Sequence, residues 1–293
     1  MSDSSVAFLG LGTMGAGMAM RLAAAGVPLT VWNRSAARAE PLRAAGAAIA
    51  ATPGDAAAGA EVVIAMVADD AASRTVWTAR DGALAAARPG AVLIECSTLS
   101  PAWVQELGQL AGARGCAFLD APVTGSKTHA ANGEMVFLVG GDAAVLDRVR
   151  PVLKPMCRDV VHLGPTGSGA VMKLVNNFLS GVQAAALGQA LAFAEAAGLD
   201  REVAMSVVTN GAPGSPLVKM VGPRMLVRDY GVNFMLSLMR KDMSYAVAEA
   251  SRHGVDLTLG AAARDAYDRA MTAGFGGQDF AAVAEGARAA GRS

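Results

Sequence analysis

The stretch Val6-Ala-Phe-Leu-Gly-Leu-Gly-Thr-Met-Gly15 joins a short apolar strand, a glycine-rich turn and the start of a helical pattern that runs from Met14 to about Ala25. Gly10 permits the tight bend, Gly12 lets a pyrophosphate approach the backbone, and Gly15 lets the helix pack closely on the strand. The helix N-terminus favours a phosphate. Because the glycines stand between a strand and a helix, the stretch predicts a dinucleotide site, with a merely tight turn as the alternative. The predicted contacts are Gly10, Leu11, Gly12, Thr13, Met14 and Gly15.

The second predicted strand, Leu29-Thr-Val-Trp32, ends where NAD-specific domains carry an acidic residue for the ribose 2′-hydroxyl. Here the chain continues with Asn33, Arg34 and Ser35, so no carboxylate repels a 2′-phosphate. The planar guanidinium of Arg34 can hold that phosphate, and Asn33 and Ser35 add hydrogen-bond donors. The pattern favours NADPH over NADH, and the alternative is an arginine in a solvated loop.

Further apolar strands alternate with alanine-rich helical segments, which indicates a mostly parallel sheet. Ligands of such sheets bind beyond the carboxyl ends of the strands. We therefore expect the turns there to meet the cofactor, with Ser97 and Thr98 facing the nicotinamide ribose. Their alternative role is to cap the helix that follows Pro101. The predicted contacts are Met66, Val67, Ala68, Ser97 and Thr98, and the predicted strands are residues 47–50, 62–67, 91–95, 117–120, 135–139 and 160–163.

A glycine-centred loop, Thr124-Gly125-Ser126, follows another of these strands. Its backbone N–H groups and hydroxyls suit a small carboxylate, so Thr124, Gly125 and Ser126 are predicted to bind substrate. The alternative is an ordinary turn. The chain has no paired carboxylates, zinc-ligand spacing or nucleophile elbow that competes for the chemistry, and its three histidines stand apart in sequence.

The stretch from Gly164 to Asn177 approaches a long helix, predicted from about Ala170 to Ala197, through three glycines. Lys173 and Asn177 are four residues apart on it, so their side chains share one face and can enter one pocket. The alternative for Lys173 is an ammonium that extends into water. We predict that Lys173 and Asn177 carry the chemistry.

After residue 170 helical patterns replace strand patterns, which predicts an α/β domain of residues 1–164 and an all-helical domain of residues 165–293 joined by the helix of about 170–197. In the second domain an apolar helix suddenly carries Lys241 and Asp242. These two residues either fold over the cofactor or emerge into solvent. The predicted helices are residues 200–210, 215–228, 233–253, 257–273 and 279–289.

Composition excludes several partners. The net charge is zero and charged residues make up 17% of the 293, which gives no reason to expect nucleic acid or an anionic membrane. The three cysteines lack metal-ligand spacing and read as reduced thiols. Hydrophobic residues reach 53%, yet every apolar run is too short to span a bilayer, and no signal peptide is evident. We expect a cytoplasmic protein.

Four ordered signatures make the whole chain resemble the β-hydroxyacid dehydrogenase family: residues 8–15, 120–126 and 164–177, and the pair Lys241 and Asp242. The resemblance implies an N-terminal Rossmann dinucleotide-binding domain followed by an all-helical C-terminal domain. It also implies a catalytic lysine at Lys173 and a substrate-orienting asparagine at Asn177. Carboxylate binding would fall to Thr124, Gly125 and Ser126. The cofactor NADP(H) would border Phe234, Lys241 and Asp242.

Within the family, residues 33–35, 125–127 and 274–280 are most similar to the glyoxylate and succinic semialdehyde reductases. Members that act on 3-hydroxyisobutyrate or tartronate semialdehyde more often have Ser-Gly-Gly where this chain has Thr124-Gly125-Ser126, and they remain the alternative. Imine reductases share the fold but usually lack the lysine, so imine reduction is at most a side activity. The 6-phosphogluconate dehydrogenases share the Lys and Asn helix but are much longer chains.

The resemblance implies hydride transfer from NADPH to the carbonyl carbon of a short aldehyde acid while Lys173 donates a proton to the oxygen, or the reverse oxidation. A non-catalytic NADPH-binding sensor is the alternative of another class, although a binder has no need of Lys173 and Asn177. The long apolar helix predicts a homodimer or homotetramer whose interface is made mainly by residues after Ala170. The resemblance implies the same, since members of the family are commonly dimers or tetramers built through the helical domain.

Overall fold

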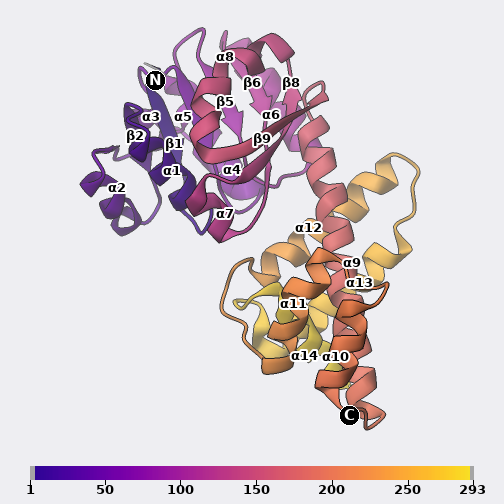
Figure 1. Cartoon of the computed structure of the whole chain (residues 1–293). Helices are drawn as coiled ribbons and strands as arrows, with labels where there is room; N and C mark the ends of the chain where they lie inside the picture. The colour runs from indigo at the N-terminus through magenta and orange to yellow at the C-terminus, as the bar shows by residue number, and fades with distance from the viewer. Residues whose placement is uncertain (1–3, 291–293) are drawn as a thin grey trace. The chain divides into compact units, whose positions relative to one another are not determined.

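The computed structural model describes residues 4–290, and its backbone contacts divide the chain into two compact units, Met1–Lys173 and Leu174–Ser293. The division falls inside helix α9 (Ser168–Ala196), one continuous helix in Figure 1. The domain boundary expected between residues 164 and 165 lies slightly earlier and stays a prediction.

The first unit is built on a nine-stranded sheet with the order β3-β2-β1-β4-β5-β6-β8-β7, and β9 pairs with β8 (Figure 1). The six strands β1 to β6 run parallel to one another, as the alternation of strands and helices predicts. Strand β8 is antiparallel to β6 and β7 and parallel to β9. The strands are β1 (Val6–Leu9), β2 (Leu29–Trp32), β3 (Ala48–Ile49), β4 (Val62–Ala65), β5 (Val92–Glu95), β6 (Ala117–Asp120), β7 (Val123–Thr124), β8 (Met135–Gly141) and β9 (Cys157–Gly164).

Both faces of the central strands are buried, which explains why these strands read as continuous apolar runs. Phe8 and Ile64 point into one hydrophobic cluster, which includes residues of α1 and α8, whereas Leu9 and Val63 point into another under α4 and α6. The unit is therefore a three-layer sandwich with helices on each side of the sheet. Its helices are α1 (Gly15–Ala24), α2 (Glu40–Ala44), α3 (Pro53–Ala57), α4 (Asp70–Thr78), α5 (Ala83–Ala86), α6 (Pro101–Ala113), α7 (Lys127–Asn132) and α8 (Ala143–Leu153).

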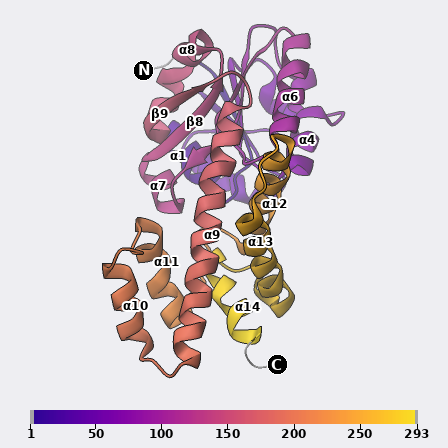
Figure 2. The ribbon, with the colours of Figure 1, turned by 90° about the vertical axis from the view of Figure 1, so that its right-hand side faces the viewer.

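The second unit is helical around the rest of α9, and its core includes Leu187, Met239 and Tyr267. Figure 2 shows this part of α9 between α10 and α11 on one side and α13 and α14 on the other. The Rossmann and helical fold class predicted from the sequence is confirmed. The helices are α10 (Arg201–Asn210), α11 (Pro216–Val227), α12 (Leu236–Arg252), α13 (Thr258–Ala270) and α14 (Val283–Ala290).

Two features of the sheet differ from the expectation. Strand β7 has two residues and is too short to show a pattern. Strand β9 begins at Cys157 and not at the predicted Val160, since the exposed polar residues Arg158 and Asp159 hid its start in the sequence. Over residues 4–290, the helices lack the combination of length and hydrophobicity that a transmembrane segment requires.

Candidate functional site

The glycine turn after β1 is shaped by close backbone approach. Gly10 has φ +101°, and a Cβ there would lie 2.3 Å from the Met66 carbonyl oxygen. A Cβ on Gly15 would lie 2.1 Å from the Gly10 oxygen, so α1 starts directly against the turn. A Cβ on Gly12, by contrast, meets nothing within 4 Å. This open space beside Gly12, at a helix N-terminus, fits the pyrophosphate of a dinucleotide.

Asn33 connects the end of β2 to this turn. Its Oδ1 accepts a hydrogen bond from Leu11 N at 2.8 Å, and its Nδ2 donates to Ser35 O at 2.9 Å. Both groups of the Asn33 amide therefore shape the loop, and its expected contact with a phosphate through the second N–H stays a prediction. Arg34 and Ser35 are exposed at the same end of the sheet.

Three hydrogen bonds to or from side chains link the segments that follow β4 and β5. Ser97 is 2% exposed, and its Oγ accepts a hydrogen bond from Val67 N at 2.7 Å. Ser100 donates from N and Oγ to the Asp70 carboxylate at 2.9 and 2.6 Å. The structure thus brings Met66 to Ala68 beside Ser97 and Thr98, as the parallel sheet predicts. Whether Ser97 and Thr98 contact the ribose stays a prediction.

The cap of α6 differs from the alternative considered for Ser97 and Thr98. Ser100 is the N-cap residue, and its Oγ accepts a hydrogen bond from Trp103 N at 3.3 Å. The signal lay in the sequence, because Ser100 directly precedes Pro101, a common first residue of a helix.

A buried carboxylate, Glu95, underlies these turns. Its Oε2 accepts hydrogen bonds from Ser73 Oγ at 2.7 Å and Trp77 Nε1 at 2.8 Å, and its Oε1 accepts one from Ser97 N at 2.9 Å. Trp103 Nε1 in turn donates to Ser73 Oγ at 2.9 Å. Burial raises the pKa of Glu95, and the hydrogen bonds to the carboxylate oppose that rise. Sequence reasoning missed this network because its members come from β5, α4 and α6.

The loop predicted to bind a carboxylate lies where β7 meets α7. Gly125 has φ +135°, so a side chain there would be strained. Ser126 is the N-cap of α7, with its Oγ 2.7 Å from His129 Nδ1, and Ser126 N donates to the same ring nitrogen at 3.1 Å. The hydroxyl and amide of Ser126 are therefore engaged with His129. That capping box, Ser126 with the residue three positions later, was a signal that sequence reasoning missed.

The predicted catalytic pair lies on α9, where Lys173 is half-buried and Asn177 is buried, one turn apart. Asn177 Nδ2 donates to Asp242 Oδ2 at 2.6 Å, and Asn176 Nδ2 donates to Asn177 Oδ1 at 3.0 Å. Lys241 Nζ lies 3.0 Å from Asp242 Oδ1. The half-buried state of Lys173 fits both a pocket-facing ammonium and one that extends into water, so its catalytic role stays a prediction.

Asp242 and Phe234 make defined contacts within the helical unit, and their predicted cofactor contacts stay predictions. Asp242 is 1% exposed and holds Asn177 and Lys241, so we assign it to orienting these side chains. Phe234 packs against Phe280 with ring centroids 5.8 Å apart, and its N donates to Asp279 Oδ2 at 3.0 Å. Lys241, also 5.0 Å from the centre of the Tyr245 ring, keeps its expected role as a prediction.

Two family models together match nearly the whole chain. The NAD binding domain of 6-phosphogluconate dehydrogenase matches residues 5–164, and the NAD-binding domain of NADP-dependent 3-hydroxyisobutyrate dehydrogenase matches residues 167–286. The chain belongs to the β-hydroxyacid dehydrogenase family. Its homologues are oxidoreductases that act on the CH–OH group of hydroxy acids, and the matches to NAD-binding domains confirm that the cofactor is a nicotinamide dinucleotide. The contacts of the glycine turn with that cofactor stay a prediction.

Relatives of this β-hydroxyacid dehydrogenase carry different names. An NAD-dependent L-serine dehydrogenase of Pseudomonas aeruginosa is 36% identical over 95% of this chain and 96% of that protein. The glyoxylate/succinic semialdehyde reductase 2 of Arabidopsis thaliana is 34% identical over 98% and 80%. The Mycobacterium tuberculosis 3-hydroxyisobutyrate dehydrogenase structure with L-serine is 34% identical, covers 97% of this chain and 99% of its own, and superimposes with a TM-score of 0.87.

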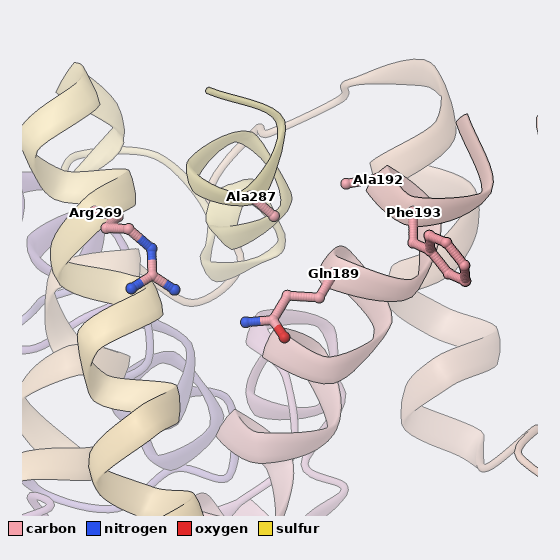
Figure 3. Close-up of a pocket in the computed structure, with 5 residues that line it drawn as sticks. All are labelled: Gln189, Ala192, Phe193, Arg269 and Ala287. Atoms are coloured by element: carbon pink, nitrogen blue, oxygen red, sulfur yellow. The ribbon is translucent and has the colours of Figure 1, made fainter. Parts of the chain in front are cut away.

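The helical unit carries a shallow hollow, away from the predicted catalytic pair, with a volume of about 500 Å³. In Figure 3, Gln189 of α9 and Arg269 of α13 extend toward one another across it. Gln189 lies sixteen residues after Lys173 on α9, roughly 24 Å along the helix at 1.5 Å per residue. The hollow is therefore not the predicted active site. Its lining residues are Gln189, Ala192, Phe193, Arg269 and Ala287.

Two glycines of the cofactor turn should respond oppositely to alanine. Gly12→Ala is expected to leave the melting temperature unchanged, because its Cβ enters open space, and to weaken binding of the nicotinamide dinucleotide about 10-fold or more by blocking the pyrophosphate. Gly15→Ala is expected to lower the melting temperature, because its Cβ meets Gly10 O. Fluorescence titration and thermal unfolding measure the two effects, and unchanged binding by Gly12→Ala would place the pyrophosphate elsewhere.

Removing the buried carboxylate should be costly. Glu95→Ala is expected to reduce the free energy of unfolding by about 3 kcal/mol, because Trp77 Nε1 and Ser97 N lose their acceptor in a buried site. Glu106→Ala is the matched control. It breaks an exposed pair with Arg74 and should cost much less than Glu95→Ala in urea denaturation. Equal losses for the two variants would contradict the importance of burial.

Proposed function

We propose that this β-hydroxyacid dehydrogenase reduces a short aldehyde acid, glyoxylate or succinic semialdehyde, to the hydroxy acid with NADPH, or runs the reverse oxidation. The observation that carries the proposal is the pairing of Lys173 with Asn177 one turn apart on α9, with the Asn177 amide held by Asp242. A nicotinamide-binding protein without catalysis has no use for a proton donor and an oriented amide there.

The preference for NADPH rests on the end of β2. Arg34 is exposed beside the turn that Asn33 fixes, and residues 33–35 contain no carboxylate to repel a 2′-phosphate. A guanidinium binds phosphate through charge-assisted, bidentate hydrogen bonds. The charge of Arg34 therefore supports NADPH, whereas the name of the P. aeruginosa relative, an NAD-dependent enzyme, is the reason to test both cofactors.

When bound, the reduced nicotinamide supplies the hydride that the carbonyl carbon receives. Lys173 offers N–H donors to the carbonyl oxygen, stabilises its developing negative charge and gives it a proton. A carboxamide has two N–H donors, and Asp242 accepts one from Asn177, which orients the other for a substrate oxygen. The backbone N–H groups around Gly125 and the hydroxyl of Thr124 would hold the substrate carboxylate.

The substrate class draws support from two directions. The names of the Arabidopsis relatives support glyoxylate and succinic semialdehyde. The relatives named for L-serine and 3-hydroxyisobutyrate support a second candidate, oxidation of a short β-hydroxy acid, in which the same lysine accepts the proton. Both candidates carry a carboxylate and a carbonyl or hydroxyl oxygen on one short carbon chain. Imine reduction is tested as a side activity in the same assay.

One assay separates these functions. The change in NADPH or NADH absorbance is followed with glyoxylate, succinic semialdehyde, tartronate semialdehyde and a cyclic imine, and in the oxidative direction with L-serine and 3-hydroxyisobutyrate. The proposal expects the highest kcat/KM for an aldehyde acid with NADPH. A higher kcat/KM for an oxidation selects the second candidate. Binding of NADPH with no turnover of any of these compounds supports a sensor and overturns the proposal.

We also propose that the chain forms a homodimer or homotetramer through the helical unit. In the single chain Phe193 is 76% and Leu179 53% exposed on α9, and Phe193 borders the shallow hollow (Figure 3). Exposed apolar side chains on a helix rich in apolar residues are typical of a surface that another subunit covers.

Light scattering at micromolar concentration should therefore give a mass of at least twice the 29.5 kDa of one chain. Phe193→Glu should lower that mass, because a charge in an apolar interface is costly. Val161→Glu, at an exposed apolar site on β9, is the control and should leave the mass unchanged. A wild-type mass near 29.5 kDa would exclude the assembly.

A further inference from the structure

The carboxylate of Asp120, at the end of β6, is 0% exposed and holds the beginning of α9. Its Oδ1 accepts a hydrogen bond from Gly167 N at 2.8 Å, and its Oδ2 accepts one from Ala170 N at 2.8 Å. Amides at a helix N-terminus lack partners within the helix, and a negative charge there is stabilised by the helix dipole. A side chain from another strand, fifty residues earlier than Ala170, thus caps α9.

Two glycines, Gly140 and Gly169, let the backbone approach the Asp120 carboxylate closely. A Cβ on Gly140 would lie 2.5 Å from Asp120 Oδ1, and one on Gly169 would lie 2.9 Å from Oδ2. A Cβ on Gly169 would also lie 2.3 Å from Leu138 O. Glycine at both positions lets β8 and α9 approach the carboxylate, so a small displacement of the helix would break the two hydrogen bonds.

The position of Asp120 relates it to the residues that the proposed function uses. Ala170 precedes Lys173 by three residues, so the amide that Asp120 holds lies one turn before Lys173 on the same face of α9. On the other side, Asp120 leads through two residues into β7 and the loop Thr124-Gly125-Ser126. One side chain thereby joins the segment predicted to bind the substrate carboxylate to the helix of the predicted proton donor.

We propose that Asp120 is a positioning residue for catalysis, which fixes the position and rotation of the start of α9 so that the Lys173 ammonium faces the carbonyl of a substrate whose carboxylate the loop Thr124-Gly125-Ser126 holds. The inference rests on the proposed function of Lys173. A proton donor displaced by about 1 Å can lose a large part of its effect on the rate. Asp120 therefore acts through Lys173 and not by contact with the substrate.

A double-mutant cycle tests this dependence. Asp120→Asn keeps the size of the side chain but replaces one acceptor oxygen by an amino group, and it is expected to lower kcat about 10-fold with NADPH affinity unchanged. In the Lys173→Ala background the same substitution should change kcat less than about twofold. Asp142→Asn is the matched control, because Asp142 caps α8 through Ala144 N and Val145 N and is exposed. It should leave kcat unchanged in both backgrounds.

The outcomes are distinguishable. If Lys173→Ala keeps full turnover, the proposed function fails. If Lys173→Ala loses turnover but Asp120→Asn lowers kcat equally in both backgrounds, the proposed function stands and Asp120 has a merely structural role. If Asp120→Asn does not fold, Asp120→Ser, which keeps one acceptor oxygen, takes its place in the cycle. Failure of both to bind NADPH, while Asp142→Asn behaves normally, assigns Asp120 to folding and overturns the positioning role.

Discussion

Lys173→Ala is expected to lower kcat about 100-fold or more and to leave the dissociation constant for NADPH nearly unchanged, because the variant loses a general acid and not a cofactor contact. Lys173 lies on the face of α9 that also carries Asn177, and the partner of Asn177, Asp242, remains in place in the variant. Steady-state kinetics with the best aldehyde acid, together with a fluorescence titration of NADPH, measure the two quantities separately.

Two further variants define what Lys173 contributes. Lys173→Arg keeps the positive charge but not an acid that can release a proton near neutral pH, so its kcat should stay close to that of Lys173→Ala. A kcat near the wild-type value in Lys173→Arg would show that charge alone suffices. Lys219→Ala, at an exposed position on α11, is the control for loss of a lysine. Turnover of Lys173→Ala within a few-fold of wild type would leave Lys173 a structural role.

The fold could be predicted because its signals are local. The strand, glycine turn and helix at residues 6–24 are contiguous in sequence, and the alternation of strands and helices fixes a parallel sheet with its ligand edge. The antiparallel position of β8 and the two-residue β7 could not be predicted, since pairing partners are chosen by packing over long distances and a two-residue strand carries no periodicity.

The site could be predicted as residues but not as a network. The bond from Asn177 to Asp242 joins positions 65 residues apart, and the bonds of Asp120 reach 47 and 50 residues along the chain. The residues next to a buried carboxylate in sequence do not indicate which group it will bond to, because tertiary packing determines its hydrogen-bond partner. For the same reason the local sequence could not show that Asn33 accepts from Leu11 N or that Asp242 accepts from Asn177, and their predicted cofactor contacts stay predictions.

The cofactor preference depends on one exposed side chain. The amide of Asn33 is bonded to Leu11 N and Ser35 O, so the loop has a fixed shape that does not depend on Arg34. A change at Arg34 should therefore alter what the loop binds and not how it folds. The side chain lies at the carboxyl end of β2, where the ribose 2′ position of a dinucleotide is recognised in this fold.

Arg34→Asp is expected to lower the ratio of kcat/KM for NADPH to that for NADH about 100-fold or more, because it removes a bidentate phosphate contact and installs a carboxylate that repels the 2′-phosphate and accepts from a 2′-hydroxyl. Arg43→Asp, an equal change of charge at an exposed position on α2, is the matched control and should leave the ratio within about threefold. Kinetics with both cofactors at one ionic strength measure the ratio. An unchanged ratio in Arg34→Asp, or an equal change in Arg43→Asp, would remove Arg34 as the determinant and reopen NADH as the cofactor.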